Sequence, residues 1–358
     1  MNRTRRPRSA PSRRIAVVGA GIAGLACART LQRAGHAVQV FEAAPQPGGR
    51  VATQDSPFGG FDTGAQYFTV RDARFEQALQ ATARELVRPW SANAVRVLDE
   101  HGRLVEAAPP ARQPHWVGVP GMAALPARWA EPLAAGGALQ LATPIERIAP
   151  DALAPGRWQL HAAGAAGGRA VHAGFDGVLL ATPASALRDL LQTSQQCGAL
   201  QDRLAEVDVA PCWSLLAAYP HAAQPTLHSL GPQWNAARST HHRVAWLARE
   251  SSKPGRALIE RWTVHASPAW SREHQRDDPA RVAAKLLKAF AEITGIRATP
   301  ALAEARLWRD AQTLVPLGQP FWWDGALGIG ACGDWCLGDR VEDAFVSGLE
   351  LALRVIEA

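Results

Sequence analysis

The first segment of the chain combines two hydrophobic patterns that are separated by glycines. A continuous apolar run over residues 15–18 is typical of a buried strand, and residues 22–33 have helical character. A second apolar run, over residues 37–41, ends in Glu42. A strand, a glycine turn, a helix and a second strand predict the βαβ unit of a Rossmann-like domain.

The turn in this unit has the spacing of a dinucleotide-binding loop. Gly19, Gly21 and Gly24 form a GxGxxG motif between the strand and the helix. Such glycines permit a tight turn and let a pyrophosphate reach backbone N–H groups at the positive end of the helix. Glu42 lies where a carboxylate would accept hydrogen bonds from both ribose hydroxyls. Glycines also mark ordinary turns, so the prediction depends on both strands and the acid being in place.

Further patterns predict that this domain is discontinuous and carries an inserted region. We expect helical character over 71–90, a hairpin over 94–105, strands within 138–148, 157–161, 175–183, 213–219, 243–249 and 257–265, and a helix near 280–294. A glycine-rich strand at 327–334 and a capping box at Asp339 and Glu342 precede the last helix. The expected domains are a basic tail at 1–13, an FAD-binding domain at 14–72, 123–185 and 325–358, and a substrate domain at 73–122 and 186–324.

Composition narrows the class of protein. The chain has 358 residues and a formal charge of +6, but its only lysines are Lys253, Lys285 and Lys288. Its arginines are interleaved with acids and form no cluster, which argues against nucleic acid as a partner. No apolar run reaches the length of a membrane span, and the arginine-rich start lacks a persuasive cleavage site. The five cysteines form no CxxC pair, so we expect a cytoplasmic protein without a metal site.

The residues after Glu42 favour a flavin over a nicotinamide as the bound dinucleotide. Gly49 and Arg50 supply flexible backbone and a cation for an extended pyrophosphate, and Gly333 and Asp334 precede a second helix start. Asp334 would accept a ribitol hydroxyl, and the helix would direct N–H dipoles at the flavin. The alternatives are an ordinary turn at 333–334 and a surface arginine at 50.

Several rarer motifs together resemble the bacterial branch of the renalase family. They lie at residues 42–50, 64–69, 71–75, 116–122, 246–249, 252–256, 265–266, 270–271, 332–336 and 340–342. The resemblance covers nearly the whole chain. It implies an α/β flavoprotein with a p-hydroxybenzoate-hydroxylase-like fold and noncovalent FAD. It also implies oxidation of 2- and 6-dihydro isomers of NAD(P) to NAD(P)⁺, with O2 reduced to H2O2.

The motifs and the resemblance together predict two sets of site residues. The expected FAD contacts are Gly19, Gly21, Ile22, Ala23, Gly24, Glu42, Gly49, Arg50, Ile145, Gly333, Asp334 and Val341. The expected substrate pocket is Gly64, Ala65, Gln66, Tyr67, Phe68, Trp116, Val117, Gly118, Val119, Pro120, His265 and Trp335. Hydride transfer from an electron-rich dihydropyridine needs stacked rings in a dry slot, so we expect no catalytic triad. Gln66 and His265 are the candidate catalytic residues, although His265 also fits a structural histidine at a strand end.

The chain departs from the family pattern at Arg306 and Asp310, where related sequences tend to have His and Tyr. Substrate preference therefore stays open, as does the choice between monomer and homodimer. One alternative is a flavin amine oxidase or desaturase, for which Lys253 is the candidate lysine beside the flavin. The other is a flavin-binding sensor without turnover, because a fold does not fix a function.

Overall fold

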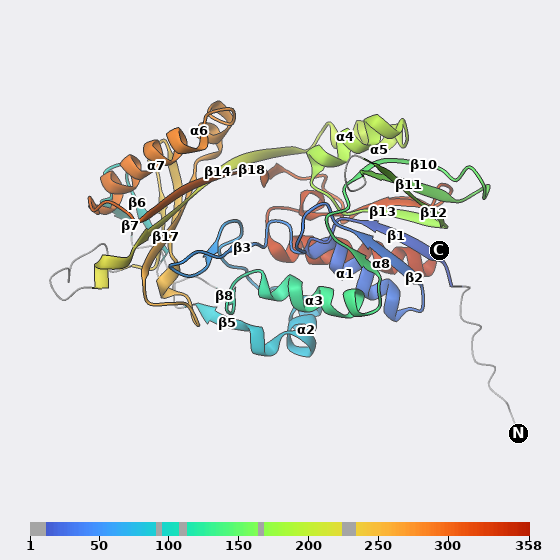
Figure 1. Cartoon of the computed structure of the whole chain (residues 1–358), viewed down its shortest axis with the longest axis horizontal. Helices are drawn as coiled ribbons and strands as arrows, with labels where there is room; N and C mark the ends of the chain where they lie inside the picture. The colour runs from blue at the N-terminus through green and yellow to red at the C-terminus, as the bar shows by residue number, and fades with distance from the viewer. Residues whose placement is uncertain (1–11, 91–94, 107–112, 164–167, 224–233) are drawn as a thin grey trace, which may run out of the picture.

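The computed structural model describes residues 12–90, 95–106, 113–163, 168–223 and 234–358. It has two lobes, which the long strands β14 (Asp208–Tyr219) and β18 (Leu302–Val315) connect along one side (Figure 1). Most of the tail expected at 1–13 lies outside the described residues. None of the described helices is both long and apolar enough to cross a bilayer.

The first lobe contains a six-stranded sheet of Rossmann type. Its order is β19-β20-β13-β1-β2-β9, parallel except for the β19–β20 pair. The central strands are almost continuously apolar because both faces of this parallel sheet are buried. The strand bounds are β1 (Arg14–Val18), β2 (Ala37–Phe41), β9 (Leu139–Gln140), β13 (Gly177–Leu180), β19 (Trp322–Asp324) and β20 (Ile329–Ala331).

Both ends of the chain contribute to this lobe. Helices α1 (Ile22–Arg33) and α8 (Val341–Glu357) cross so closely that a Cβ at Gly348 would overlap the carbonyl oxygen of Ala23. Helix α3 (Ala124–Ala135) packs beside them. A small antiparallel sheet of β10 (Ile145–Pro150), β11 (Trp158–Ala163) and β12 (Arg169–Phe175) completes the lobe, which confirms the expected fold class.

Three helices lie with the first lobe, although the expected domain boundaries assign them to the inserted region. Helix α2 (Ala73–Thr82) packs Phe75 against Trp129 and Phe345. Helices α4 (Ala184–Ser194) and α5 (Gly198–Leu204) bury their leucines in the same apolar cluster as β1 and β13. The helix expected to continue to residue 90 ends at Thr82, because the chain then forms β5 (Val87–Trp90), which pairs with β8 (His115–Gly118).

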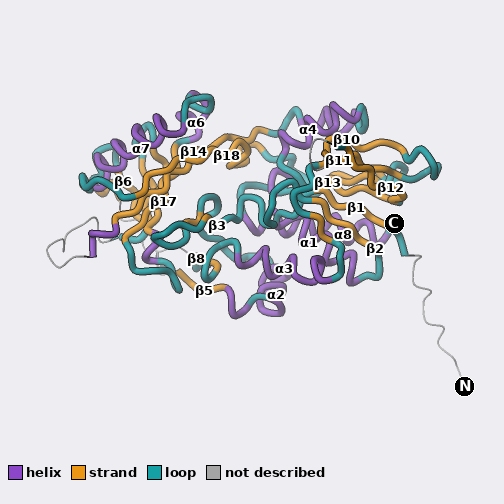
Figure 2. The backbone as a smooth tube through the Cα atoms, viewed as in Figure 1, coloured by secondary structure: helices purple, strands orange, loops and turns teal. Residues whose placement is uncertain are grey.

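The second lobe is a seven-stranded sheet in the order β18-β14-β17-β16-β15-β6-β7. Helices α6 (Pro268–Glu273) and α7 (Pro279–Thr294) cover its outer face, whereas its inner face lies toward the loops between the lobes (Figures 1 and 2). A short pair, β3 (Thr53–Gln54) and β4 (Phe61–Asp62), lies among those loops. The large strands are β6 (Val95–Leu98), β7 (Leu104–Glu106), β14 (Asp208–Tyr219), β15 (Ala236–Ser239), β16 (Val244–Arg249), β17 (Glu260–Ala266) and β18 (Leu302–Val315).

Candidate active site

The glycine loop between β1 and α1 forms an open cradle. Gly19 has a φ of +104°, which L side chains rarely adopt, and a Cβ at Gly24 would overlap the carbonyl oxygen of Gly19. By contrast, a Cβ at Gly21 would meet nothing within 4 Å. No side chain caps α1, so the N–H groups at Ile22 and Ala23 lie at an uncapped helix start. This is the arrangement that binds a pyrophosphate.

Glu42 and a second glycine pair border the same cradle. The Glu42 carboxylate accepts hydrogen bonds from the backbone N–H of Ala20 at 2.6 Å and of Ala44 at 2.9 Å. Each carboxylate oxygen has two lone pairs, so both retain capacity for ribose hydroxyls. The N–H of Gly48 donates to the Ala20 carbonyl at 2.9 Å, which brings Gly49 beside Gly21.

Arg50 and Asp334, far apart in the sequence, form a bidentate ion pair. The two guanidinium nitrogens lie 2.6 and 2.8 Å from the two carboxylate oxygens. Asp334 follows Gly333 at the end of β20, where a Cβ on Gly333 would meet the Trp335 ring. Val341 begins α8 nearby, and Ile145 begins β10 beside the first lobe's core. The pair therefore ties the second glycine loop to the C-terminal part of the chain.

The start of α8 differs from the expected capping box. Asp339 lies outside the helix and accepts a hydrogen bond from Gln312 at 3.0 Å. The helix begins at Val341, and Asp343 accepts from the N–H of Arg340 at 3.1 Å. Glu342 instead accepts from two backbone N–H groups, at 71 and 72, and so fixes the segment that leads into α2.

The segment over residues 64–68 runs from the cradle toward the second lobe. Ala65 donates its N–H to the Arg50 carbonyl at 3.0 Å, and a Cβ at Gly64 would overlap that same carbonyl. Tyr67 lies in an aromatic wall, with ring centroids 4.1 Å from His115 and 5.6 Å from Trp246. Tyr67 and Trp246 are half-buried, and partly exposed aromatic rings of this kind suit a planar ligand.

Three residues expected to line the pocket are buried in the core instead. Phe68 packs edge-on against Phe75, and Val117 is fully buried in the same cluster. Trp335 is fully buried and donates its indole N–H to the Thr182 carbonyl at 3.1 Å. Complete burial of these apolar side chains stabilises the fold around the loops that carry them.

The loop at 116–120 packs along this segment. Trp116 and Phe68 exchange two backbone hydrogen bonds of 2.8 Å. Gly118 accepts a hydrogen bond from Arg256 at 3.4 Å, and Val119 faces Gly255. Pro120 follows Val119 through a cis peptide bond. The loop therefore contacts both the 64–68 segment and the loop after β16.

A buried cluster of charged side chains lies between the two lobes and contacts the Gln66 side chain. The Lys253 ammonium contacts Asp62 at 2.9 Å, Glu250 at 2.9 Å and the Gln66 side-chain oxygen at 3.0 Å. Arg256 contacts the same Asp62 oxygen as Lys253, at 2.6 Å. The side chains of Lys253, Asp62 and Glu250 are 0% exposed. Sequence reasoning singled out Lys253 but missed this cluster.

The two acids of the cluster are shifted in opposite directions. Burial alone would raise the pKa of Asp62, but Lys253 and Arg256 together hold that pKa below its usual value. Burial raises the pKa of Glu250, and the charge of Asp62 adds to the shift against the opposing effect of Lys253. Asp62 is therefore the ionised partner of the two cations.

His265 lies beside this cluster on β17. Its ring nitrogen Nε2 is 3.5 Å from the Gln66 amide nitrogen, and the ring hydrogen-bonds to the Thr63 backbone. Burial, followed by the charge of Lys253, lowers the pKa of His265 to about 4. The imidazole is therefore neutral at neutral pH.

This low pKa predicts a measurable pH dependence of stability. The pKa of His265 in the folded protein lies below its value of about 6.5 in the unfolded chain. At pH values between these two pKa values the unfolded chain therefore binds more protons than the folded protein. The stability that His265 contributes is fully present above the unfolded-state pKa of about 6.5, and it is lost as the pH falls toward about 4. Urea unfolding at pH 7.5 and 5.0 should show a larger acid loss for the wild type than for His265→Asn. An equal loss in both proteins would contradict the low pKa, and His101→Asn, at an exposed site, is the control.

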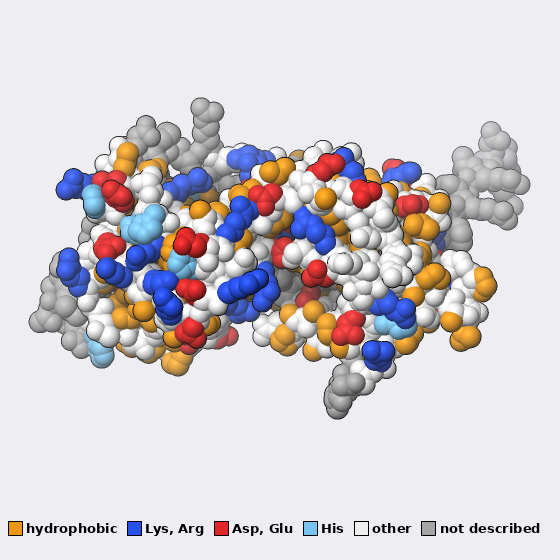
Figure 3. Space-filling view, turned by 90° about the horizontal axis from the view of Figure 1, so that it is seen from above, with side chains coloured by type: hydrophobic (Ala, Val, Ile, Leu, Met, Phe, Trp, Pro, Cys, Tyr) orange, Lys and Arg blue, Asp and Glu red, His pale blue; other side chains and the backbone are white. Residues whose placement is uncertain are grey.

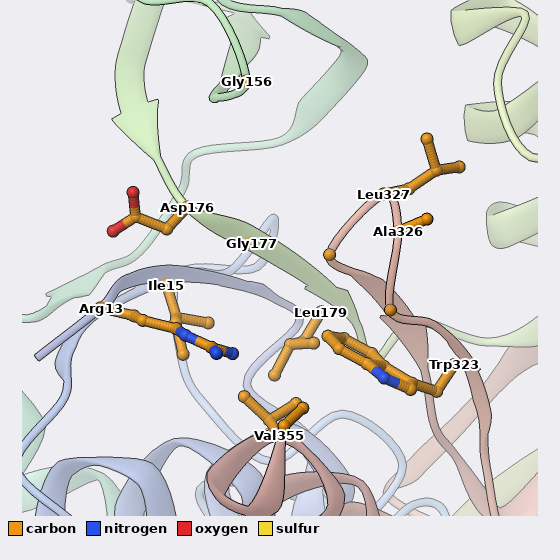
Figure 4. Close-up of a pocket in the computed structure, with 13 residues that line it drawn as sticks. Arg13, Ile15, Gly156, Asp176, Gly177, Leu179, Trp323, Ala326, Leu327 and Val355 are labelled. Carbon is orange, nitrogen blue, oxygen red and sulfur yellow. The ribbon is translucent and has the colours of Figure 1, made fainter. Parts of the chain in front are cut away.

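Seen from above, the surface is hollowed between the lobes, and charged side chains of both signs gather around the hollow (Figure 3). A separate groove of about 190 Å³ lies at the opposite ends of the parallel strands (Figure 4). It is lined by Arg13, Asp176, Trp323 and Val355. Dinucleotides bind at the carboxyl ends of such strands, so the glycine cradle, and not this groove, is the candidate site.

Comparison with known proteins identifies the family. Residues 17–104 match the NAD(P)-binding Rossmann-like domain, and residues 110–356 match the flavin containing amine oxidoreductase family. The chain belongs to the flavin-containing amine oxidoreductases. It is therefore a flavin-dependent oxidoreductase, with FAD as its cofactor.

Individual relatives of this amine oxidoreductase are distant or match only in part. A hydroxyneurosporene desaturase of Cereibacter sphaeroides is 40% identical over 73 residues, which is 20% of this chain and 14% of the desaturase. The structure named "Putative protoporphyrinogen oxidase" from Exiguobacterium sp. 255-15 has a TM-score of 0.75 and 15% identity, covering 97% and 99% of the two chains. Putrescine oxidase bound to putrescine has a TM-score of 0.68 and 13% identity, covering 97% and 100%. These structures show a shared fold.

The residues present fit FAD. The open space at Gly21 and the uncapped start of α1 suit its diphosphate, and Glu42 at the end of β2 suits the adenosine ribose. When bound, FAD supplies the electron acceptor of the reaction. Among the residues that the structure describes, no cluster of three or more His, Cys, Asp or Glu side chains is placed to hold a metal ion.

Proposed function

We propose that this oxidoreductase oxidises the 2- and 6-dihydro isomers of NAD(P). In this reaction the dihydropyridine ring would lose a hydride with its electron pair and become the pyridinium of NAD(P)⁺, and bound FAD would supply the electron acceptor. O2 then takes the two electrons, with two protons, and is reduced to H2O2. The resemblance to bacterial renalases supplies this substrate class, and the arrangement of charges around the aromatic wall supports it.

The supporting observation is that the two buried carboxylates next to Gln66 both contact a lysine, and the Glu250 oxygen that has no hydrogen-bond partner among the described residues is fully buried. A cationic amine substrate needs a negative partner, and the two buried acids there, Asp62 and Glu250, are already paired with Lys253. A neutral His265 and the wall formed by Tyr67 and Trp246 suit an uncharged planar ring instead. Gln66 itself is buried: its side-chain amide donates to the Asp62 and Gly64 carbonyls and its side-chain oxygen accepts from Lys253, so it fixes the segment before Tyr67.

Rapid anaerobic mixing tests the proposal against its alternatives. Separated 2-, 4- and 6-dihydro isomers of NAD, and putrescine as an amine, are each mixed with the FAD-loaded protein while flavin absorbance is followed. We expect the 2- and 6-dihydro isomers to bleach the flavin much faster than they bleach free FAD. Bleaching by the amine alone would favour an amine oxidase, and no acceleration over free FAD by any of the reductants would favour a sensor without turnover.

A further inference from the structure

Polar side chains form a row across the inner face of the seven-stranded sheet. The strand register pairs Ser214 with Arg306 on one side and with His265 on the other, and it pairs His265 with Trp246. Directly opposite residues on neighbouring strands project from the same face of a sheet. His265 contacts Gln66 and Trp246 contacts Tyr67, so this face lies toward the candidate pocket.

Two groups in this row are buried without a partner. Ser214 is fully buried, and its hydroxyl has no hydrogen-bond partner among the described residues. The indole N–H of Trp246 is also buried, and it too lacks a partner within the described part of the chain. Buried polar groups are nearly always hydrogen-bonded, so two unpartnered groups in one row, on either side of His265, point to a ligand that supplies acceptors.

Arg306 supplies a positive charge at one end of the row. It is exposed, and it makes no ion pair with any residue that the structure describes. Its guanidinium lies 5.1 Å from the centroid of the Trp308 ring, and the Trp308 indole is fixed by a 2.8 Å hydrogen bond to the Thr63 carbonyl. Glu304, two residues earlier on the same strand, accepts a 2.9 Å hydrogen bond from Gln54. The guanidinium is thus held near the pocket but remains free for an anion.

We propose that this row binds the phosphate-bearing part of the substrate, with Arg306 contacting phosphate oxygens. The inference rests on the proposed function, because it assigns a part of the same dinucleotide. Guanidinium and indole groups only donate hydrogen bonds, and arginine matches phosphate geometry well. Neighbouring strands lie about 4.8 Å apart, so the row from Arg306 to Trp246 extends over about 14 Å. That span suits an extended nucleotide.

The test measures phosphate recognition separately from turnover. ADP-ribose is titrated into FAD-loaded wild type, Arg306→Gln and Arg306→Lys by calorimetry, with Arg297→Gln as a matched charge-removal control at an exposed site beyond α7. Loss of a charged hydrogen bond should weaken ADP-ribose binding about tenfold to about a hundredfold in Arg306→Gln. Lysine should restore part of the affinity, and added salt should weaken the wild type more than Arg306→Gln.

A second measurement compares the reduction of the flavin by a dihydronicotinamide mononucleotide and by the corresponding riboside, which lacks phosphate. Arg306→Gln should raise KM for the mononucleotide and leave the riboside unchanged. Equal effects on both reductants, or no ADP-ribose binding by the wild type, would overturn the assignment of Arg306. If ADP-ribose binding depends on Arg306 but no dihydronicotinamide reduces the flavin, the phosphate site stands and the proposed function fails.

Discussion

Replacing Lys253 with methionine is expected to reduce the free energy of unfolding by about 3–5 kcal/mol, the cost of removing one partner from a buried ion pair. Methionine is close in length and apolar, so the side-chain volume is largely kept. The ammonium of Lys253 has three acceptors, and its removal leaves Glu250 without its contacting cation in a fully buried position. Urea unfolding of the FAD-free protein measures the loss without a contribution from cofactor binding.

A matched control and a double variant test whether the loss of stability comes from the buried cluster. Lys288→Met makes the same chemical change on the exposed side of α7 and should alter stability by less than about 0.5 kcal/mol. Adding Glu250→Gln to Lys253→Met should recover part of the loss, because it replaces the buried acid that has lost its contacting cation with a neutral amide. Asp62 keeps Arg256 and the Met122 N–H, at 2.6 and 2.9 Å, in both variants. Equal stability of Lys253→Met and Lys288→Met, or no recovery in the double variant, would show that the cluster does not hold the lobes together.

The cluster also bears on the amine oxidase alternative. Lys253 is the lysine that the sequence offers for a position beside the flavin. In the structure its ammonium bonds to Asp62, Glu250 and Gln66, so it orders the segment that carries Tyr67. We therefore regard Lys253 as a positioning residue. A substrate selective effect of Lys253→Met on amine oxidation would contradict that role.

The nucleotide-binding part of the fold was predictable because its determinants are local. Gly19, Gly21, Gly24 and Glu42 lie within one βαβ unit, and each one restricts the backbone or the charge at a single turn. In the structure β1 pairs with β13 and β13 pairs with β20, so strands from both ends of the chain lie in one sheet. Short-range spacing was sufficient there because the phosphate site itself is built from one turn.

The second lobe was harder to predict because its signals are weak or distant. Strand β18 was missed: it lies at the edge of the sheet and exposes much of its length, so its residues alternate less clearly than those of a buried strand. The cluster of Asp62, Glu250, Lys253 and Arg256 joins two loops that are far apart in the sequence, so no spacing rule reveals it. Phe68, Val117 and Trp335 lie in motifs near the site, but tertiary packing places them in the core.

Replacing Gly24 with alanine is expected to weaken FAD binding about tenfold to about a hundredfold, although alanine is the better helix former. The reason is steric: a Cβ at Gly24 would lie well inside 3.0 Å of the backbone oxygen of Gly19, and backbone atoms cannot rotate away. Forcing a methyl group into such a contact costs about 1–3 kcal/mol and displaces the start of α1 from the glycine loop. The uncapped N–H groups of that helix would then no longer converge on the diphosphate position.

Gly198→Ala is the matched control, because Gly198 begins helix α5 and a Cβ there would meet nothing within 4 Å. Flavin fluorescence on dilution gives the dissociation constant of FAD for both variants, and circular dichroism verifies that both are folded. Gly198→Ala should bind FAD as the wild type does. If Gly24→Ala also retains FAD with unchanged affinity, the close approach of α1 to β1 is not what forms the diphosphate site. The assignment of the cradle around Gly21 as the cofactor position would then lose its main structural argument.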